Sequence, residues 1–476
     1  MTALLAMAAM LTNGHAWEKE VVYQIFPRSY YDSDGDRHGD LKGIASKLDE
    51  VRELGATALL INPVQRSRTY HNYFADDFYS VDPDYGSNDD FRELCRQAHR
   101  RKIKVLLDME PQYVADGHPW WAPEYADRVW REGSWLYGID VPWYDGQKIQ
   151  VAAINPNNPE VREEMKKLFH LWQDLGADGF RLDHAMDDLD LKGVATGMLK
   201  DFWRPVVDAC RAKDPDVLFV AEQADWAGPT GSYYDVAGVD AVFAFRSAGS
   251  FLGMDKKKIE DALRETPPPG RTHFVFIENH DMPRYASVAK GDPALMRLGA
   301  VYNLTAKGTP ILYYGQELGM PGLQGKWGSD GNDIPIRLAY RWSSRLDAPG
   351  SATWYAGSGP WARTRFEKNG GGTSLEEQKK DPGSLYRFYQ RLIALRKANR
   401  GLSAGGQKVL KIDNPHVVGY ERGSAKVFLN LSKEPQAVRL KSRATWRDLW
   451  NGGDVPGEDG WKSIRLGPHG FAIVSG

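Results

Sequence analysis

The sequence GFRLDHA (residues 179–185) is a short apolar run that ends in charged side chains. Two later stretches, FVAEQA (219–224) and FIENHDMPR (276–284), have the same form. Short apolar runs of this kind are typical of strands buried on both faces of a parallel sheet. We therefore expect three strands that each present a carboxylate at the carboxyl end. The three acids are Asp183, Glu222 and Asp281.

Strand-like runs alternate with helix-like segments over most of the chain. Two apolar stripes of helical spacing are clear, one from Leu41 to Leu54 before Gly55 and one from Val161 to Leu175 before Gly176. Glycine is favoured just beyond a helix C-terminus. Eight strands in alternation with amphipathic helices predict an α/β fold of the (β/α)8 TIM barrel type, with its active site at the carboxyl ends of the strands. The eight runs are VVYQIFP (21–27), ATALLINPV (56–64), KVLLDME (104–110), GFRLDHA (179–185), VLFVAEQ (217–223), VDAVFAF (239–245), THFVFIENHD (272–281) and TPILYYGQE (309–317).

Two segments interrupt the alternation. Residues 109–150 contain proline, glycine and five tryptophans without periodicity. So long an excursion is uncommon unless it is functional, and it predicts a small inserted domain. Beyond residue 403 the runs become short and alternating, which predicts a C-terminal antiparallel β-sandwich over 403–476 that covers the barrel. The barrel is then expected to comprise residues 17–108 and 151–402.

Composition excludes some partners. With 61 basic and 63 acidic residues, the chain has no electrostatic footprint for nucleic acid or for an anionic membrane surface. Cys95 and Cys210 lie on helix-like segments far apart in the sequence, so we expect both to be free and buried.

The N-terminus has features of a signal peptide. Residues 3–11 form an apolar run too short to cross a bilayer, and Gly14-His15-Ala16 is an acceptable cleavage site. We interpret residues 1–16 as a signal peptide of a periplasmic or secreted protein, although no positively charged residue precedes the apolar run. The alternative is an ordinary N-terminal helix of a cytoplasmic protein.

The three strand-end acids indicate a chemistry. Carboxyl ends of parallel strands meet at one face of a barrel, so the acids are expected to lie together. Paired carboxyl groups are what cleavage of a glycosidic bond requires. The alternative for each acid alone is a salt bridge at a strand end.

The chain resembles the α-amylase family of retaining α-glycoside hydrolases and transglycosylases over essentially its full length. The resemblance implies that Asp183 is the nucleophile, that Glu222 is the acid/base and that Asp281 binds sugar hydroxyls. Five strings carry it in the family order: YHNYFADDFYSVDPDYGS (70–87), GFRLDHA (179–185), FVAEQA (219–224), ENHD (278–281) and GTPILYYGQELG (308–319).

The resemblance also implies substrate-binding residues. Arg181 shares a strand face with Asp183 and would keep it ionised. His280 would donate a hydrogen bond to the sugar, and Tyr73 would stack under its ring. In the segment GNDIPIRLAYRW (331–342), Asp333 and Arg337 would bind hydroxyls of the non-reducing end. Phe74 and Tyr113 complete the expected set.

A second group of residues suggests a cation site. The loop DSDGDRHGD (32–40) has the spacing of the first part of an EF-hand loop, and the resemblance implies one structural Ca²⁺ ion there. The alternative is a solvated acidic turn. The expected ligands are Asp32, Asp34, Asp36, Asp40 and, through its main chain, His38.

The sequence departs from the family at the third strand. The family pattern is Asp-x-Val-x-Asn-His, and this chain has Asp108-Met-Glu-Pro-Gln112-Tyr113. Gln112 stands for an asparagine that often binds a second calcium ion, and Tyr113 for a histidine that contacts the sugar. Glu110 adds a carboxyl group, and His118 could compensate or have no role. We therefore expect an altered sugar subsite and no second calcium site.

These features favour an oligosaccharide substrate. We expect hydrolysis of α-glucosidic bonds in maltooligosaccharides. A transglycosylase or isomerase acting on a disaccharide such as sucrose or trehalose would use the same intermediate, and a non-catalytic sugar-binding barrel is the third hypothesis. The tryptophans of the insertion either line acceptor subsites or form its core.

Overall fold

Eight parallel strands close into a barrel, as the alternation predicts. The computed structural model describes residues 17–476 apart from 133–134, 137, 143–147, 189–196, 224–232, 358 and 362–368. The strand order around the barrel is β1-β15-β14-β13-β12-β11-β5-β2, so the first and last strands pair and complete the circle. The strands are β1 (Val22–Ile25), β2 (Ala58–Ile61), β5 (Lys104–Met109), β11 (Gly179–Leu182), β12 (Leu218–Ala221), β13 (Ala241–Phe243), β14 (Thr272–Val275) and β15 (Thr309–Tyr313).

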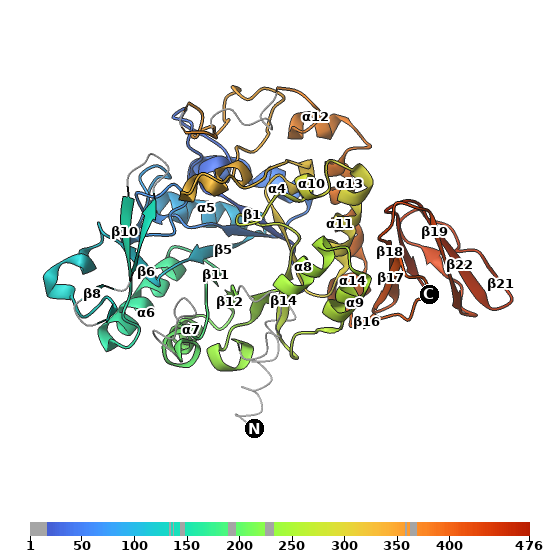
Figure 1. Cartoon of the computed structure of the whole chain (residues 1–476), viewed down its shortest axis with the longest axis horizontal. Helices are drawn as coiled ribbons and strands as arrows, with labels where there is room; N and C mark the ends of the chain where they lie inside the picture. The colour runs from blue at the N-terminus through green and yellow to red at the C-terminus, as the bar shows by residue number, and fades with distance from the viewer. Residues whose placement is uncertain are drawn as a thin grey trace.

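Helices surround the barrel (Figure 1). The apolar stripe after the first strand forms two helices, because α3 ends at Ser46 and α4 begins at Leu48, with Lys47 between them. Gly55 and Gly176 adopt positive φ angles of 105° and 111°, which end their helices as expected. The α-helices are α3 (Leu41–Ser46), α4 (Leu48–Leu54), α5 (Asn88–Arg100), α6 (Pro159–Asp174), α7 (Arg204–Lys213), α8 (Phe245–Leu252), α9 (Lys256–Arg264), α10 (Tyr285–Val288), α11 (Pro293–Thr305), α12 (Leu375–Lys380), α13 (Leu385–Ala398) and α14 (Arg400–Ala404).

Short helical turns occur in the connections. Within the described ranges, five are of 3-10 type and two are of π type. The 3-10 turns are η1 (Pro27–Ser29), η2 (Pro119–Trp121), η3 (Pro123–Tyr125), η7 (Gln316–Leu318) and η8 (Asp330–Ile336). The π turns are η5 (Leu199–Trp203) and η6 (Tyr233–Ala237).

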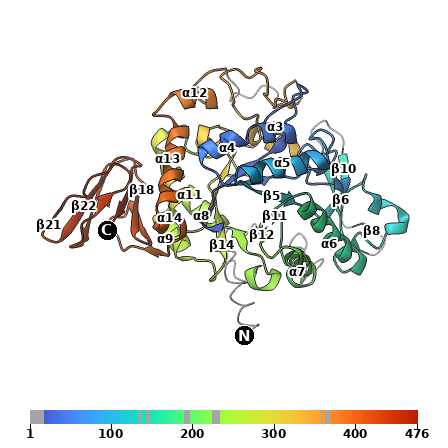
Figure 2. The ribbon, with the colours of Figure 1, turned by 180° about the vertical axis from the view of Figure 1, so that it is seen from behind.

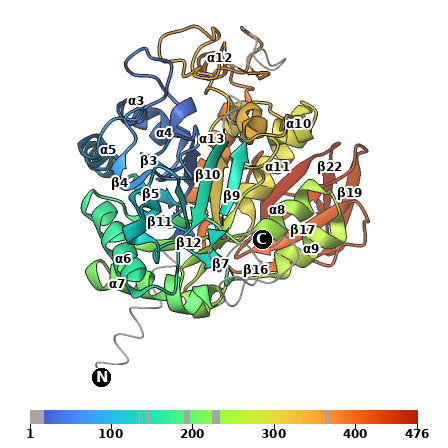
Figure 3. The same cartoon turned by 60° about the vertical axis from the view of Figure 1, so that its left-hand side comes forward.

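A small β structure is inserted between β5 and α6. Strands β6 (Tyr113–Ala115), β10 (Lys148–Ala153) and β9 (Gly138–Pro142) form an antiparallel sheet, in which β9 and β10 lie side by side (Figure 3). The other short pairs are β7 (Arg131–Glu132) with β8 (Trp135–Leu136), and β3 (Gln65–Arg66) with β4 (Asp77–Val81). Trp120 is buried against Phe78 and His118, so this tryptophan belongs to a core rather than to a sugar-binding surface.

The C-terminal strands form two antiparallel sheets at the opposite end of the molecule from the insertion (Figures 1 and 2). Tyr420 and Arg422 anchor them to α11, because the Tyr420 hydroxyl lies 2.5 Å from Thr305 Oγ1 and Arg422 donates to the Thr305 carbonyl at 2.7 Å. One sheet contains β16 (Gln407–Val409), β17 (Val417–Arg422), β18 (Ala425–Asn430), β23 (Phe471–Ser475) and β20 (Arg447–Asp448). The other contains β19 (Gln436–Lys441), β22 (Trp461–Leu466) and β21 (Gly457–Glu458).

Two further expectations concern the ends and the cysteines. Cys95 and Cys210 are free and buried, which confirms the prediction. The predicted signal peptide lies outside the described residues. Within the described part of the chain, no helix combines the length and apolar character needed to span a bilayer.

Candidate active site

The three strand-end acids meet in one cavity. Asp183 directly follows β11 and Glu222 directly follows β12. The strand β14 ends at Val275, earlier than expected, so Asp281 is carried on the following loop. All three acids nevertheless line a cavity of about 380 Å³ at the carboxyl ends of the strands.

Arg181 connects the acids at the base of this cavity. The register of β11 and β5 places Arg181 beside Asp108, to which Nη1 donates at 2.6 Å. The same nitrogen donates to Asp183, and Nη2 lies 3.0 Å from Glu222 Oε2. Because one guanidinium contacts both Asp183 and Glu222, the two carboxyl groups lie close together. This arrangement fits the short separation, about 5 Å, of carboxyl pairs in retaining glycosidases.

The pKa values of these two acids move in opposite directions. Burial favours the neutral form of Asp183, but the Arg181 charge and a hydrogen bond from Glu110 outweigh it and lower the pKa of Asp183. Burial is the main influence on Glu222 and raises its pKa, although Arg181 opposes the rise. Asp183 is therefore held ionised, and Glu222 retains its proton to higher pH than an ordinary glutamate. A nucleophile and an acid require these two opposite protonation states.

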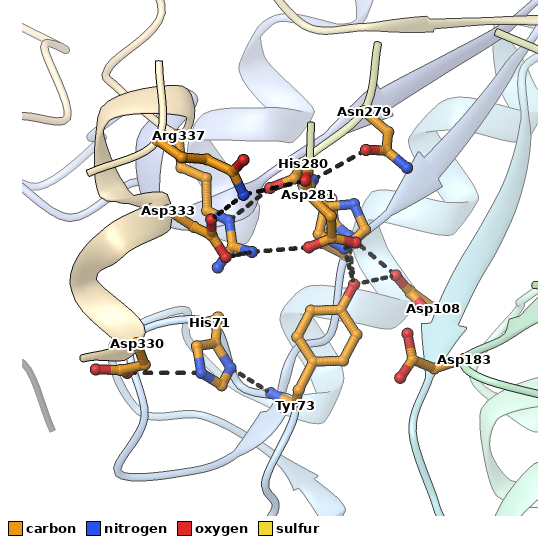
Figure 4. Close-up of polar contacts among 12 residues, drawn as sticks. His71, Tyr73, Asp108, Asp183, Asn279, His280, Asp281, Asp330, Asp333 and Arg337 are labelled. Carbon is orange, nitrogen blue, oxygen red and sulfur yellow. Dashed lines mark hydrogen bonds and ion pairs between the residues drawn. The ribbon is translucent and has the colours of Figure 1, made fainter. Parts of the chain in front are cut away.

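Tyr73 and His280 form the next wall. Their rings stack with centroids 5.5 Å apart and an interplanar angle of 4°. The Tyr73 hydroxyl donates to Asp108 at 2.7 Å and lies 2.5 Å from His280 Nε2 (Figure 4). Burial, together with the nearby arginines, holds the pKa of His280 well below its usual range, so His280 is neutral near pH 7.

Asp281 is tied to Arg337 on the far side of the cavity. Arg337 Nη2 donates to Asp281 at 2.9 Å and to Asp333 at 3.2 Å, and Nε donates to the His280 carbonyl at 2.9 Å (Figure 4). The Asp281 side chain is 44% exposed, against 19% for Asp183 and 13% for Glu222. Of the three acids, Asp281 is therefore the most open to a ligand.

The residues of the altered third-strand motif have separate roles. Gln112 Nε2 donates to the main-chain oxygens of Asp183 at 2.9 Å and His184 at 3.2 Å, so it supports the nucleophile segment. Tyr113 lines the cavity and meets Phe74 edge to face, with centroids 6.4 Å apart. His118 is buried in the insertion and, among the described residues, is not part of the cavity wall.

Three cavity residues were not anticipated from the sequence. His71, His184 and Asp330 line the same space as the acids. Asp330 Oδ2 lies 3.7 Å from His71 Nε2, and both side chains are largely buried. His71 and His184 lie within the motif strings 70–87 and 179–185, and Asp330 lies three residues before Asp333, so their positions in the sequence were the available signals.

The predicted cation loop brings the carboxyl groups of three of its four aspartates together. Carboxylate oxygens of Asp32, Asp34 and Asp40 lie within 4.8 Å of one another. Asp36 and His38 instead contact each other, with Nδ1 of His38 3.4 Å from the Asp36 carboxylate, and their side chains lie outside this group of the described residues. Asp40 also caps α3 by accepting from Gly43 N–H at 2.7 Å.

The barrel and its paired carboxyl groups define a glycoside hydrolase site. The family model "Alpha amylase, catalytic domain" matches residues 24–137 and 121–405. "Alpha-amylase 3" of Dictyoglomus thermophilum is 29% identical and covers 96% of this chain and 93% of its own. "Probable oligo-1,6-glucosidase 2" of Bacillus subtilis is 28% identical, with 89% and 91% covered. The crystal structure of the α-amylase from H. orenii superposes with a TM-score of 0.80, at 26% identity, over 96% of this chain and 99% of that one.

The chain belongs to the α-amylase family of glycoside hydrolases.

Proposed function

We propose that this enzyme hydrolyses α-glucosidic bonds in short α-gluco-oligosaccharides with retention of configuration. The observation that carries the proposal is the Arg181 guanidinium, which contacts Asp183 and Glu222 at once while the pKa of Asp183 is lowered and that of Glu222 is raised. A retaining mechanism needs one ionised and one protonated carboxyl group at short separation.

The residues perform two displacement steps. In the first, Asp183 attacks the anomeric carbon while Glu222 gives its proton to the departing glycosidic oxygen, and a β-glycosyl ester forms on Asp183. In the second, Glu222 takes a proton from water, the hydroxide attacks the anomeric carbon, and Asp183 leaves as a carboxylate. The sugar is released with its α configuration retained.

The walls of the cavity supply recognition. Asp281 and Arg337 offer a carboxylate and a guanidinium to sugar hydroxyls, and contacts that strengthen as the ring distorts lower the barrier. The stacked rings of Tyr73 and His280 give the sugar a flat, partly apolar surface. A cavity of about 380 Å³ favours short substrates over the interior of a long polymer.

We propose that Asp32, Asp34 and Asp40 hold a structural Ca²⁺ ion. Three converging carboxylates repel one another unless a cation neutralises them, and Ca²⁺ takes oxygen ligands in flexible geometry. Asp40 begins α3, so an ion here would fix the loop to the start of that helix. Its contribution would be to stability, because these residues are separate from those that line the cavity.

Product analysis tests the proposed function. Purified enzyme and an Asp183→Asn control would be incubated with maltooligosaccharides, isomaltose, sucrose, trehalose and nitrophenyl α-glucoside, and the products separated by mass and followed by NMR. The proposal expects wild-type products only, released first as the α anomer. Products longer than the substrate, or isomerised disaccharides, would instead identify a transglycosylase or isomerase. Binding without turnover would identify a sugar-binding barrel.

A further inference from the structure

Glu110 occupies a position at which the family pattern has valine. It directly follows β5, is 7% exposed and lines the cavity together with Asp183 and Glu222. A carboxyl group in so enclosed a place needs a partner or a proton, because an unpaired buried charge is costly. The two displacement steps described above use Asp183 and Glu222 only, so they leave Glu110 without a role.

The contacts of Glu110 direct it towards the nucleophile. The Gln112 backbone N–H donates to Oε1 at 2.6 Å and holds one oxygen of the carboxyl group in place. The pairing of β5 with β11 sets Met109 beside Leu182, and Asp183 N–H donates to the Met109 carbonyl at 2.9 Å, so Glu110 and Asp183 follow side by side at the ends of the two strands. Both side chains line the cavity, and their carboxyl groups interact. Two carboxyl groups share a hydrogen bond only when one of them carries a proton.

The surrounding charges decide which acid carries that proton. Arg181 donates to Asp183 and thereby stabilises the negative charge there. Burial, followed by the adjacent charge of Asp183, raises the pKa of Glu110 well above its usual range. Glu110 is therefore the neutral donor, and Asp183 is the ionised acceptor.

We propose that Glu110 is a positioning residue that acts through Asp183, by donating a hydrogen bond to the nucleophile carboxylate and to the same carboxyl group once it is esterified. The inference rests on the proposed retaining hydrolysis. In the first step Asp183 loses its negative charge, so the bond from Glu110 weakens. In the second step the carboxylate forms again and the bond strengthens, because hydrogen bonds to charged acceptors are the stronger ones. Glu110 therefore assists release of the sugar from Asp183, and its proton remains on Glu110 throughout.

Two substitutions separate this role from a structural one. Glu110→Gln keeps an N–H donor for Asp183 and a carbonyl oxygen for the Gln112 N–H, whereas Glu110→Val removes the donor and restores the residue of the family pattern. Glu317→Gln is the matched control, because Glu317 is also a buried acid but is held by Tyr23 and Tyr340 away from the cavity. The probe is α-glucosyl fluoride, whose fluoride leaves without protonation by Glu222.

The expected result is a split between kinetic parameters. Glu110→Val should lower kcat about tenfold or more, leave kcat/KM unchanged or raised, and accumulate a glycosyl adduct visible in the intact protein mass, because the second step is slowed while the first no longer has to weaken this bond. Glu110→Gln and Glu317→Gln should stay within about threefold in both parameters and show no adduct. Equal kcat/KM losses in both Glu110 variants, or a Glu110→Val enzyme that matches the wild type, would overturn the positioning role.

An infrared difference spectrum gives a readout independent of turnover. The wild type minus Glu110→Gln spectrum at neutral pH should contain the C=O band of a protonated carboxyl group, and a carboxylate band in its place would overturn the inference. A wild type with no turnover on any α-glucoside would overturn the proposed function, and the positioning role with it. An active wild type without the protonated band would overturn the inference alone.

Discussion

Replacing Arg181 by methionine tests the electrostatic design of the site. The Arg181 side chain is 2% exposed and contacts Asp108, Asp183 and Glu222, so the substitution removes a guanidinium that these three acids share. Removing one partner of a buried ion pair costs about 3 to 5 kcal/mol. Burial raises the pKa of Asp108 to about 7 even with Arg181 beside it, so this acid can take up a proton once the cation is gone, and we expect a loss in the free energy of unfolding of about 3 kcal/mol.

The effect on activity follows from Asp183. Without Arg181, burial dominates and raises the pKa of the nucleophile, and each pH unit below that pKa removes about tenfold of the ionised form. We expect kcat/KM to fall about 100-fold or more at mildly acidic pH and to recover partly as the pH rises. In the wild type the activity instead declines at alkaline pH, because Glu222 loses the proton that the leaving group needs.

The assay is kcat/KM for nitrophenyl α-glucoside from about pH 4 to about pH 9, together with urea unfolding at each pH. Arg181→Lys is the matched control. It retains the charge but has a single nitrogen, which cannot reach Asp183 and Glu222 as the two guanidinium nitrogens do, so we expect an intermediate loss. The reasoning is refuted if kcat/KM of Arg181→Met falls less than about threefold and the acidic limb of its pH profile coincides with that of the wild type.

Three further outcomes are expected. Burial raises the pKa of Glu317 from 4.5 to about 7, so the folded state keeps a proton that the unfolded state loses. This stabilisation is fully present below pH 4.5 and is lost as the pH rises through 7. In urea unfolding, the free energy of unfolding of the wild type should therefore fall by about 3 kcal/mol relative to that of Glu317→Gln over this pH range. Parallel plots of unfolding free energy against pH for the two proteins would contradict this expectation. Tyr73→Phe keeps the stacked ring but removes the hydroxyl bonded to Asp108, and kcat/KM should fall about 10-fold or more, with an unchanged value counting against this role. Removing calcium with a chelator should lower the Tm of the wild type, whereas Asp34→Asn should respond less, and equal responses would argue against a site at Asp34.

Much of the fold could be predicted because it depends on local patterns. Each of the eight apolar runs contains a barrel strand, and the positions of Gly55 and Gly176 mark two helix ends. The apolar stripe from Leu41 to Leu54 did not reveal that two helices form along it, since the interruption at Lys47 leaves the apolar spacing intact. The strand before Asp281 was placed too long for a similar reason, because FIENHD continues an apolar run after the barrel pairing has ended.

The candidate site was predictable only in part. Asp183, Glu222, Asp281, Tyr73, Phe74, Tyr113, His280 and Arg337 line one cavity, with Arg181 at its base. In the cation loop, sequence spacing could not distinguish the three acids that converge from Asp36, whose carboxylate lies beside the His38 ring. The direction in which a loop side chain points depends on the backbone turns of the folded loop, and residue spacing does not specify those turns.

The sequence by itself determined the barrel and the placement of an acid at or just beyond the end of three of its strands, because strand periodicity and the direction of parallel strands are properties of local segments. Only the tertiary structure decided which acid is charged. Residues 110 and 183 are far apart in the chain, and their side chains come together because β5 and β11 are neighbours in the closed barrel. A pKa depends on burial and on nearby charges, and both arise when distant segments pack together.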